Sequence, residues 1–228
     1  MKTNRILLSG LALGLIMGAC QNPTSNTGGG SEDTSAQEQT TGMGSNSSMM
    51  RQDTSMMAGM NQMMKEMHQM KMTGNADYDL ARMLKYHHQG AIDMSEAELR
   101  SGTDQQLKDM ARKTIDMQKK EIRDLEAIAD KYRSAPKNYD PTNKNDGLGQ
   151  DMDKNMRAMM EMGHDMSESI DHQFASMMKK HHEDGVGMAE MIVKHGKDAA
   201  FKSMAQKTIE EQKKDIAKLD EWLDKYKE

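Results

Sequence analysis

The chain has 228 residues, of which 36% are hydrophobic and 4% aromatic, so it can form one modest domain, or two at most. Its formal net charge of −5 argues against nucleic acid as a partner. It contains 28 Met and one Cys, which excludes an intrachain disulfide. Thioethers, rather than thiolates, are therefore the soft metal donors of the folded part.

The first 19 residues have the pattern of a secretory signal peptide, because a basic start precedes an apolar run that is too short to span a membrane. Small residues followed by Cys20 resemble the bacterial lipoprotein signal, in which that cysteine is lipidated. Ordinary secretion, with cleavage near Ala19, is the alternative. By the same resemblance, Gln21 after the cysteine favours the outer membrane. We therefore expect a periplasmic lipoprotein that is anchored to a membrane through Cys20.

Two segments of different composition follow the signal. Residues 20–48 are rich in Ser, Thr, Gly, Asn and Gln, which predicts a disordered tether. Residues 49–72 are rich in Met and predict a helix. Their methionines recur at spacings of four and three, as in an amphipathic seam: Met56, Met60, Met63, Met67 and Met70. Such a seam serves either as apolar core or as a set of metal donors, and the sequence leaves both readings open.

Residues 73–228 form the predicted bundle domain and contain an internal duplication. The segment Met83–Met94, with two adjacent histidines, returns 94 positions later as Met177–Met188. The match continues without a gap to a Lys-Tyr pair near the end of each copy. Such a repeat predicts two similar units that pack against each other. We assign repeat 1 to residues 77–132, the linker to 133–150 and repeat 2 to 151–228.

Periodicity and cap signals predict helices throughout this domain. Gly102 and Gly196 mark helix ends, and Thr103–Gln106 has the pattern of a capping box. Short connections make consecutive helices antiparallel neighbours. We expect an all-α, up-and-down bundle built from a duplicated helical hairpin with additional Met-rich helices. The predicted helices cover about 77–100, 103–133, 151–166, 171–195 and 198–226.

The duplicated segment carries the candidate metal ligands. Met83, His87 and Met94 lie at i, i+4 and i+11, on one face of a helix, and the second copy repeats this face and extends it. The second histidine of each adjacent pair, His88 or His182, points about 100° away from the first, toward a neighbouring helix or a second site. A thioether and imidazole face can hold a soft metal. The candidates are Met83, His87, His88, Met94, Met177, His181, His182, Met188, Met191 and His195.

Thioether and imidazole donors favour Cu(I), and by the same softness Ag(I), whereas Cu(II) stays open. Glu161-x-x-His164 matches the spacing of di-iron bundles, but it occurs once and such bundles need two of these motifs together with further glutamates.

The paired histidines with their flanking Met, followed by Gln118 and by Glu121-Ile122, resemble the family catalogued as domain of unknown function 305. The resemblance covers about residues 77–226. It implies a ferritin-like helical bundle, and it implies copper binding through Met and His, as is reported for some secreted members. The second copy departs from the pattern at Gly185-Val186, where the family has Ala-Ile, and at Asp215, where it has Glu.

The sequence therefore predicts a periplasmic or extracellular copper-binding protein that serves metal tolerance, buffering or delivery and catalyses no reaction. Its expected partners are metal ions, a membrane and a copper efflux or delivery protein. One alternative is a Met-rich scaffold that grips apolar partners without metal. A second alternative is a di-iron or copper redox enzyme.

Overall fold

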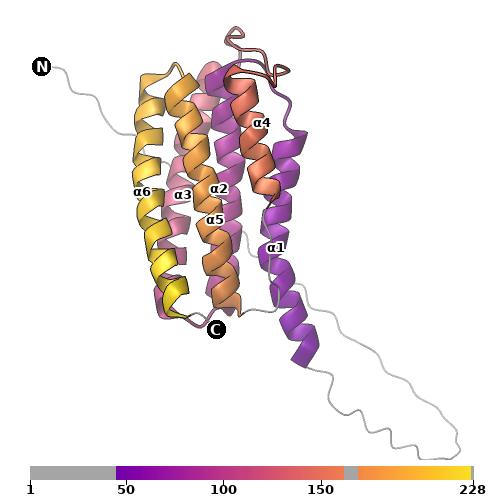
Figure 1. Cartoon of the computed structure of the whole chain (residues 1–228), viewed down its shortest axis with the longest axis vertical. Coiled ribbons are helices and arrows are strands. Elements are labelled where there is room, and N and C mark those ends of the chain that lie inside the picture. The colour runs from indigo at the N-terminus through magenta and orange to yellow at the C-terminus, as the bar shows by residue number, and fades with distance from the viewer. Residues whose placement is uncertain (1–44, 162–168, 227–228) are drawn as a thin grey trace, which may run out of the picture. The chain divides into compact units, whose positions relative to one another are not determined.

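The computed structural model describes residues 45–161 and 169–226, with side chains from residue 56 onward. The predicted signal peptide, Cys20, the tether as far as residue 44 and His164 lie outside the described residues. The described part is all-helical, as predicted (Figure 1). None of its helices is long and apolar enough to cross a membrane. The helices are α1 (Ser45–Gln69), α2 (Ala76–Ser101), α3 (Gln105–Tyr132), α4 (Gly147–Met160), α5 (Ile170–His195) and α6 (Ala199–Lys225).

The two segments that the sequence predicts to be repeats contain two helical hairpins, α2–α3 and α5–α6, each preceded by a Met helix. Gly102 and Gly196 end α2 and α5 as expected, and their backbone N–H groups donate to Glu98 and Ile192 respectively. The predicted capping box at Thr103 is wrong by one residue. Asp104 is the N-cap of α3, because its carboxylate accepts the backbone N–H of Leu107 at 3.0 Å.

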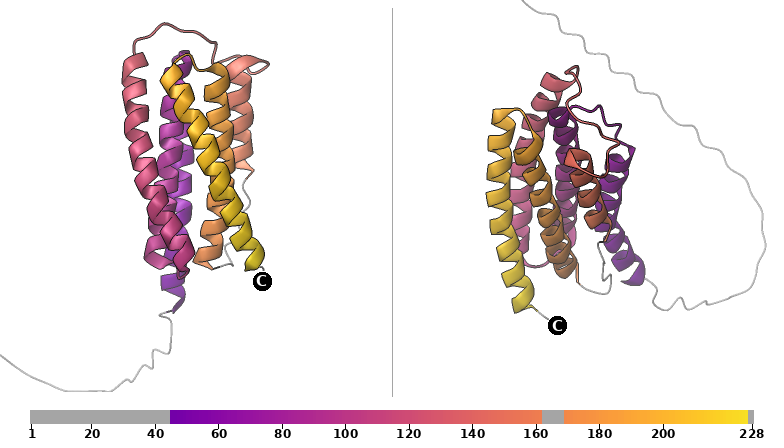
Figure 2. Two further views of the ribbon diagram at one scale, coloured as in Figure 1. Left: turned by 90° about the vertical axis from the view of Figure 1, so that its left-hand side faces the viewer. Right: turned by 45° about the horizontal axis from the view of Figure 1, so that its top comes forward.

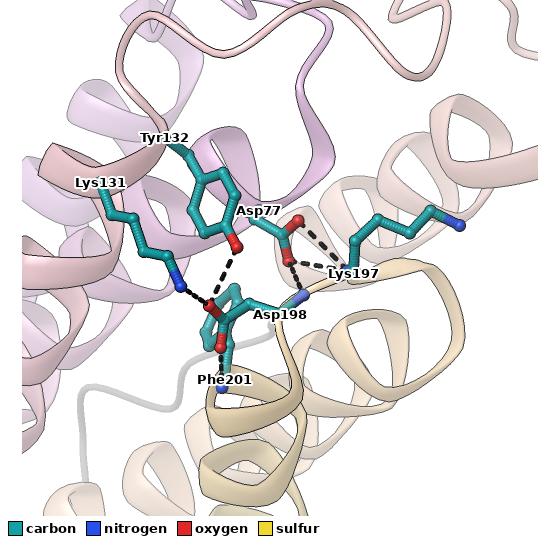
Figure 3. Close-up of polar contacts among 6 residues, drawn as sticks. All are labelled: Asp77, Lys131, Tyr132, Lys197, Asp198 and Phe201. Carbon is teal, nitrogen blue, oxygen red and sulfur yellow. Dashed lines mark hydrogen bonds and ion pairs between the residues drawn. The ribbon is translucent and has the colours of Figure 1, made fainter.

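Each repeat also caps the second helix of the other. The carboxylate of Asp77, at the start of α2, accepts the backbone N–H groups of Lys197 and Asp198 at 2.9 and 3.1 Å (Figure 3). Asp171, its counterpart at the start of α5, accepts those of Thr103 and Asp104 at 2.8 and 2.9 Å. The N-terminal end of each His-bearing helix therefore lies at the C-terminal end of the other, so α2 and α5 are antiparallel.

The α2–α5 pair lies at the centre of the bundle. Figure 1 shows α3 and α6 on one side of this pair and α1 and α4 on the other, and α3 and α6 lie nearest the viewer in the left view of Figure 2. Two faces of the pair are thus covered by different helices. Side chains on α2 and α5 are buried between these layers, as the burial of Met94 and Met188 illustrates.

The methionine seam of α1 is apolar core. Its described members are at most 8% exposed, and α1 packs on α2. The approach is close at Gly90, where an added Cβ would lie 2.8 Å from the sulfur of Met63. Burying a Met side chain contributes about 1.5–3 kcal/mol, which accounts for this seam without a metal. The seam consists of Met56, Met60, Met63 and Met67 on α1, and of Met70, which directly follows the end of the helix.

Some helix limits differ from the prediction. The first turn of α1 covers residues 45–48, which composition had assigned to the tether, and α1 ends at Gln69. The helix α4 begins at Gly147, whose φ of 62° a glycine adopts without strain, and it ends at Met160 rather than near residue 166. The loop between the repeats is tied to the bundle, because Tyr139 donates through its hydroxyl to Asp79 at 2.7 Å.

Candidate metal centre

The two histidine pairs meet at the α2–α5 contact. The rings of His87 and His181 stack with centroids 3.7 Å apart and planes inclined by 29°. His88 and His182 extend this row, at 6.4 and 6.1 Å from the rings of their neighbours. All four side chains are buried. We call His87, His88, His181 and His182 the four-histidine cluster, and the duplication places its two halves against each other.

Most ring nitrogens of this cluster have no hydrogen-bond partner among the described residues. Both nitrogens of His87 and of His182 lack one. The Nε2–H of His181 donates to the backbone carbonyl of His87 at 2.9 Å, so Nδ1 of His181 carries the lone pair and lacks a partner. A buried polar group without a partner costs about 1–3 kcal/mol. The cluster therefore contains ring nitrogens that could coordinate a metal and that no described residue hydrogen-bonds.

The surroundings of His87, His181 and His182 keep these three rings neutral. Burial, and next the neighbouring imidazoles, holds the pKa of His87 and of His181 well below 6.5. Burial, partly offset by the charge of Asp215, lowers the pKa of His182 to about 4. A neutral imidazole can coordinate a metal without first losing a proton. At neutral pH these three histidines are thus in the protonation state that a metal requires.

The candidate thioethers are buried along the same two helices. Met83 and Met188 are 1% exposed, Met94 is 0% and Met177 is 3%. Met83 and Met94 are separated by about 16 Å of helix, so one ion cannot contact both from α2 alone. In the antiparallel pair, the direction from His87 to Met83 matches the direction from His181 to Met188.

This register assigns one Met from each helix to each end of the cluster. Met83 lies about 6 Å along α2 from His87, and Met188 lies about 10 Å along α5 from His181 in the same direction. Met94 and Met177 have the same relationship at the other end. Each pair is therefore at a similar height in the bundle, to within about 5 Å. The two candidate methionines of each helix therefore lie at opposite ends of the cluster and not at the same end.

The structure does not bring Met191 and His195 to the cluster. His195 lies about 21 Å along α5 from His181. Its Nε2 is 2.7 Å from a carboxylate oxygen of Asp151 on α4, which also binds Lys194 at 2.7 Å. Met191 lines a groove of about 420 Å³ beside the same aspartate. These two candidates belong to the α4–α5 contact.

Across residues 45–161 and 169–226, no group of three or more His, Cys, Asp or Glu side chains is arranged to hold a metal ion. The four rings are thus adjacent, but their nitrogens do not converge on one point. A site at the cluster would need thioethers beside one or two imidazoles. The Glu161-x-x-His164 motif is described only at Glu161, which follows the end of α4.

The sequence analysis did not predict the side chains that surround the histidines as site residues, although the duplication aligns each of them with a polar residue of the other copy. Oε2 of Glu121, on α3, lies 2.7 Å from Nε2 of His88, without the alignment of an in-line hydrogen bond. Gln212, on α6, is buried with both amide atoms unpaired within the described part. A Cβ added at Gly185 would lie 2.5 Å from Oε1 of Gln212 and 3.0 Å from Cε1 of His87. The glycine in the second copy thus makes room for these two side chains.

A family model and several solved structures match this chain. The family model described as "Domain of unknown function (DUF305)" matches residues 29–129 and again residues 77–223. The first match contains one histidine pair and the second contains both. No curated protein sequence matches the chain.

Among solved structures, the chain is similar to CopM in its Ag-bound form, with 22% identity and a TM-score of 0.51. It is also similar to CopM in its Cu(I)-bound form and in its apo form, each with 22% identity and a TM-score of 0.50. Each match covers 67% of this chain and 98% of the CopM chain. At this identity the likeness shows the helical fold.

Proposed function

We propose that this chain, which belongs to the DUF305 family, binds Cu(I), and by the same softness Ag(I), as a cargo at the four-histidine cluster and its flanking thioethers. The candidate ligands are His87, His88, His181 and His182, with Met83 and Met188 at one end and Met94 and Met177 at the other. The role is metal tolerance, buffering or delivery.

The observation that carries this proposal is the set of unpaired ring nitrogens on His87 and His181. Burying them costs free energy in the metal-free protein, and a bound cation would recover it. Both rings are neutral and lie on helices that also bury thioethers. Neutral nitrogen and sulfur donors together suit Cu(I) better than they suit Mg²⁺, Ca²⁺ or a di-iron centre.

The comparisons support the same metal. CopM is described in Cu(I)-bound and Ag-bound forms, and 98% of its chain aligns with 67% of this one. The described methionines favour metal binding over the scaffold alternative, because only Met160 among them is exposed. A protein that grips apolar partners through Met would present them on its surface. Binding and release of a cargo ion require no catalytic step. Cu(II) would match these neutral thioether and imidazole donors less well than Cu(I).

The cellular setting is part of the proposal. A signal peptide, lipidation at Cys20 and a tether would hold the bundle in the periplasm at a membrane, with the outer membrane as the favoured site. A copper efflux or delivery protein would then receive the ion. Mass spectrometry of the mature protein tests this setting, because lipidation predicts a diacylglycerol thioether at Cys20 and cleavage before it. An unmodified N-terminus near residue 20 would contradict it.

The test of metal binding is an anaerobic competition titration of residues 45–228 with Cu(I) against a chelator. The test variant carries His87→Ala, Met94→Leu, His181→Ala and Met188→Leu. The control variant carries His68→Ala and Met160→Leu, which change an exposed histidine and an exposed methionine. We expect the test variant to bind at least about 100-fold more weakly and the control to bind as the unmodified protein does. Equal affinity of all three would refute the proposed site.

A further inference from the structure

A groove of about 680 Å³ lies between α3 and α6, on the side of the α2–α5 pair opposite α1 and α4. Its lining combines apolar groups, such as Ile128 and Ala200, with two thioethers, Met117 and Met204. Its charged lining consists of Glu121, Asp124 and Glu211 together with Lys120 and Lys207, so the carboxylates outnumber the ammonium groups by one. The groove therefore presents soft sulfur donors and a carboxylate in a place that solvent reaches.

Glu121 connects this groove with the four-histidine cluster. Its side chain is 15% exposed, and its Oε2 lies 2.7 Å from Nε2 of His88, whose side chain is 0% exposed. Its other oxygen accepts the hydroxyl of Thr208, on α6, at 3.3 Å. One carboxylate thus touches the groove, the facing helix and the first buried imidazole. Met117 lies four residues before Glu121 and shares its helix face.

The second repeat surrounds its corresponding carboxylate differently. Its counterpart of Glu121 is Asp215, which is one methylene shorter and 3% exposed. Asp215 is held by Lys218 at 2.7 Å and by Lys113 at 3.4 Å. Both ammonium groups lie within ion-pair distance of this carboxylate, so they compete with a cation for its oxygens. The cluster therefore has a carboxylate open to a groove at its His88 end and a carboxylate occupied by lysines at the other.

We propose that the α3–α6 groove is the access route of the cargo ion and that Met117, Met204 and Glu121 form a transfer site at its base. The ion moves from the thioethers to the carboxylate and then to His88, and it leaves by the same path. This inference rests on the proposed function, since it concerns how Cu(I) reaches the cluster. It assigns a second, transient site for a soft monovalent cation.

The test separates rate from affinity. The loaded protein is mixed with excess Cu(I) chelator under anaerobic conditions, and the transfer rate is followed by the absorbance of the chelate. The variants are Met117→Leu with Met204→Leu, which removes the sulfurs and keeps their volume, and Glu121→Gln. Ser203→Trp fills the groove from an exposed position without removing a donor. Met160→Leu is the control.

We expect each of the three groove variants to slow transfer about tenfold. Ser203→Trp, which removes no donor, should also keep a Kd within about twofold of that of the unmodified protein. The control should transfer at the unmodified rate. Unchanged rates in all three groove variants, with the metal still bound, would overturn the access route and leave the proposed function standing. Absence of Cu(I) binding by the unmodified protein would instead overturn the proposed function and the route together.

Discussion

His87 and His181 stack on each other at the centre of the bundle, with ring centroids 3.7 Å apart, although 94 residues separate them in the chain. They occupy equivalent positions in the two copies of the duplicated sequence. Because the two copies of this helix pack in antiparallel orientation, the equivalent histidines meet. This contact concentrates imidazole nitrogens in a place where the described residues offer most of them no hydrogen-bond partner.

Replacing His87 by Phe separates stability from metal binding. The substitution keeps a ring in the core and removes two buried nitrogens that lack partners. We expect the free energy of unfolding of the metal-free protein to rise by about 1 kcal/mol, while Cu(I) affinity falls at least about tenfold. Urea denaturation and chelator competition measure the two effects. A metal-free protein that loses stability and keeps its affinity would show that His87 is an ordinary core residue.

The reciprocal caps predict a symmetric loss of stability. Asp77→Ala and Asp171→Ala each leave two backbone N–H groups at a helix start without their carboxylate, so each should lower the free energy of unfolding by about 1–2 kcal/mol. The two caps lie at opposite ends of the α2–α5 pair, so the double variant should lose the sum to within about 0.5 kcal/mol. Equilibrium denaturation checks this, and a strongly non-additive double variant would contradict independent caps.

The raised pKa of Glu98 predicts how the free energy of unfolding depends on pH. Burial, and next the hydrogen bond and charge of Asp171, raises the pKa of Glu98 from 4.5 to about 8. Between these values the folded chain holds a proton that the unfolded chain has released, so raising the pH favours unfolding. We expect the contribution of Glu98 to stability to be complete below pH 4.5 and to be lost as the pH rises through 8.

Glu98→Gln keeps the shape of the side chain and removes this titration. Urea denaturation of the metal-free protein between pH 5 and 9 should therefore give a flatter stability profile for this variant than for the unmodified protein. Glu96→Gln, on the exposed part of the same helix, is the matched control and should leave the profile unchanged. Parallel profiles for Glu98→Gln and the unmodified protein would show that Glu98 is ionised in the folded state.

The local features of the fold could be predicted from the sequence. The α1 seam of Met56 to Met70, the glycine stops at Gly102 and Gly196 and the two histidine helices all depend on neighbours within one or two turns. The spacing of Met83, His87 and Met94 also placed all three on the buried side of α2. Such patterns reflect helical geometry alone.

The relationships between helices could not be predicted in the same way. Helical spacing says nothing about the register of α2 against α5, which decides that Met83 accompanies Met188 and that His87 meets His181. The contact of Glu121 with His88 and the diversion of His195 to Asp151 depend on that packing too. The duplication did align Glu121 with Asp215, and this alignment was the available signal that both positions surround the cluster.

X-ray absorption at the copper K edge of the Cu(I)-loaded protein tests the central claim most directly. Imidazole and thioether ligation predicts an edge typical of Cu(I) together with both nitrogen and sulfur neighbours in the first shell. The nitrogen contribution should decrease in the variant with His87→Ala and His181→Ala, which keeps only His88 and His182 of the cluster. A first shell of oxygen and nitrogen without sulfur, or a spectrum that this variant leaves unchanged, would contradict copper binding at the four-histidine cluster.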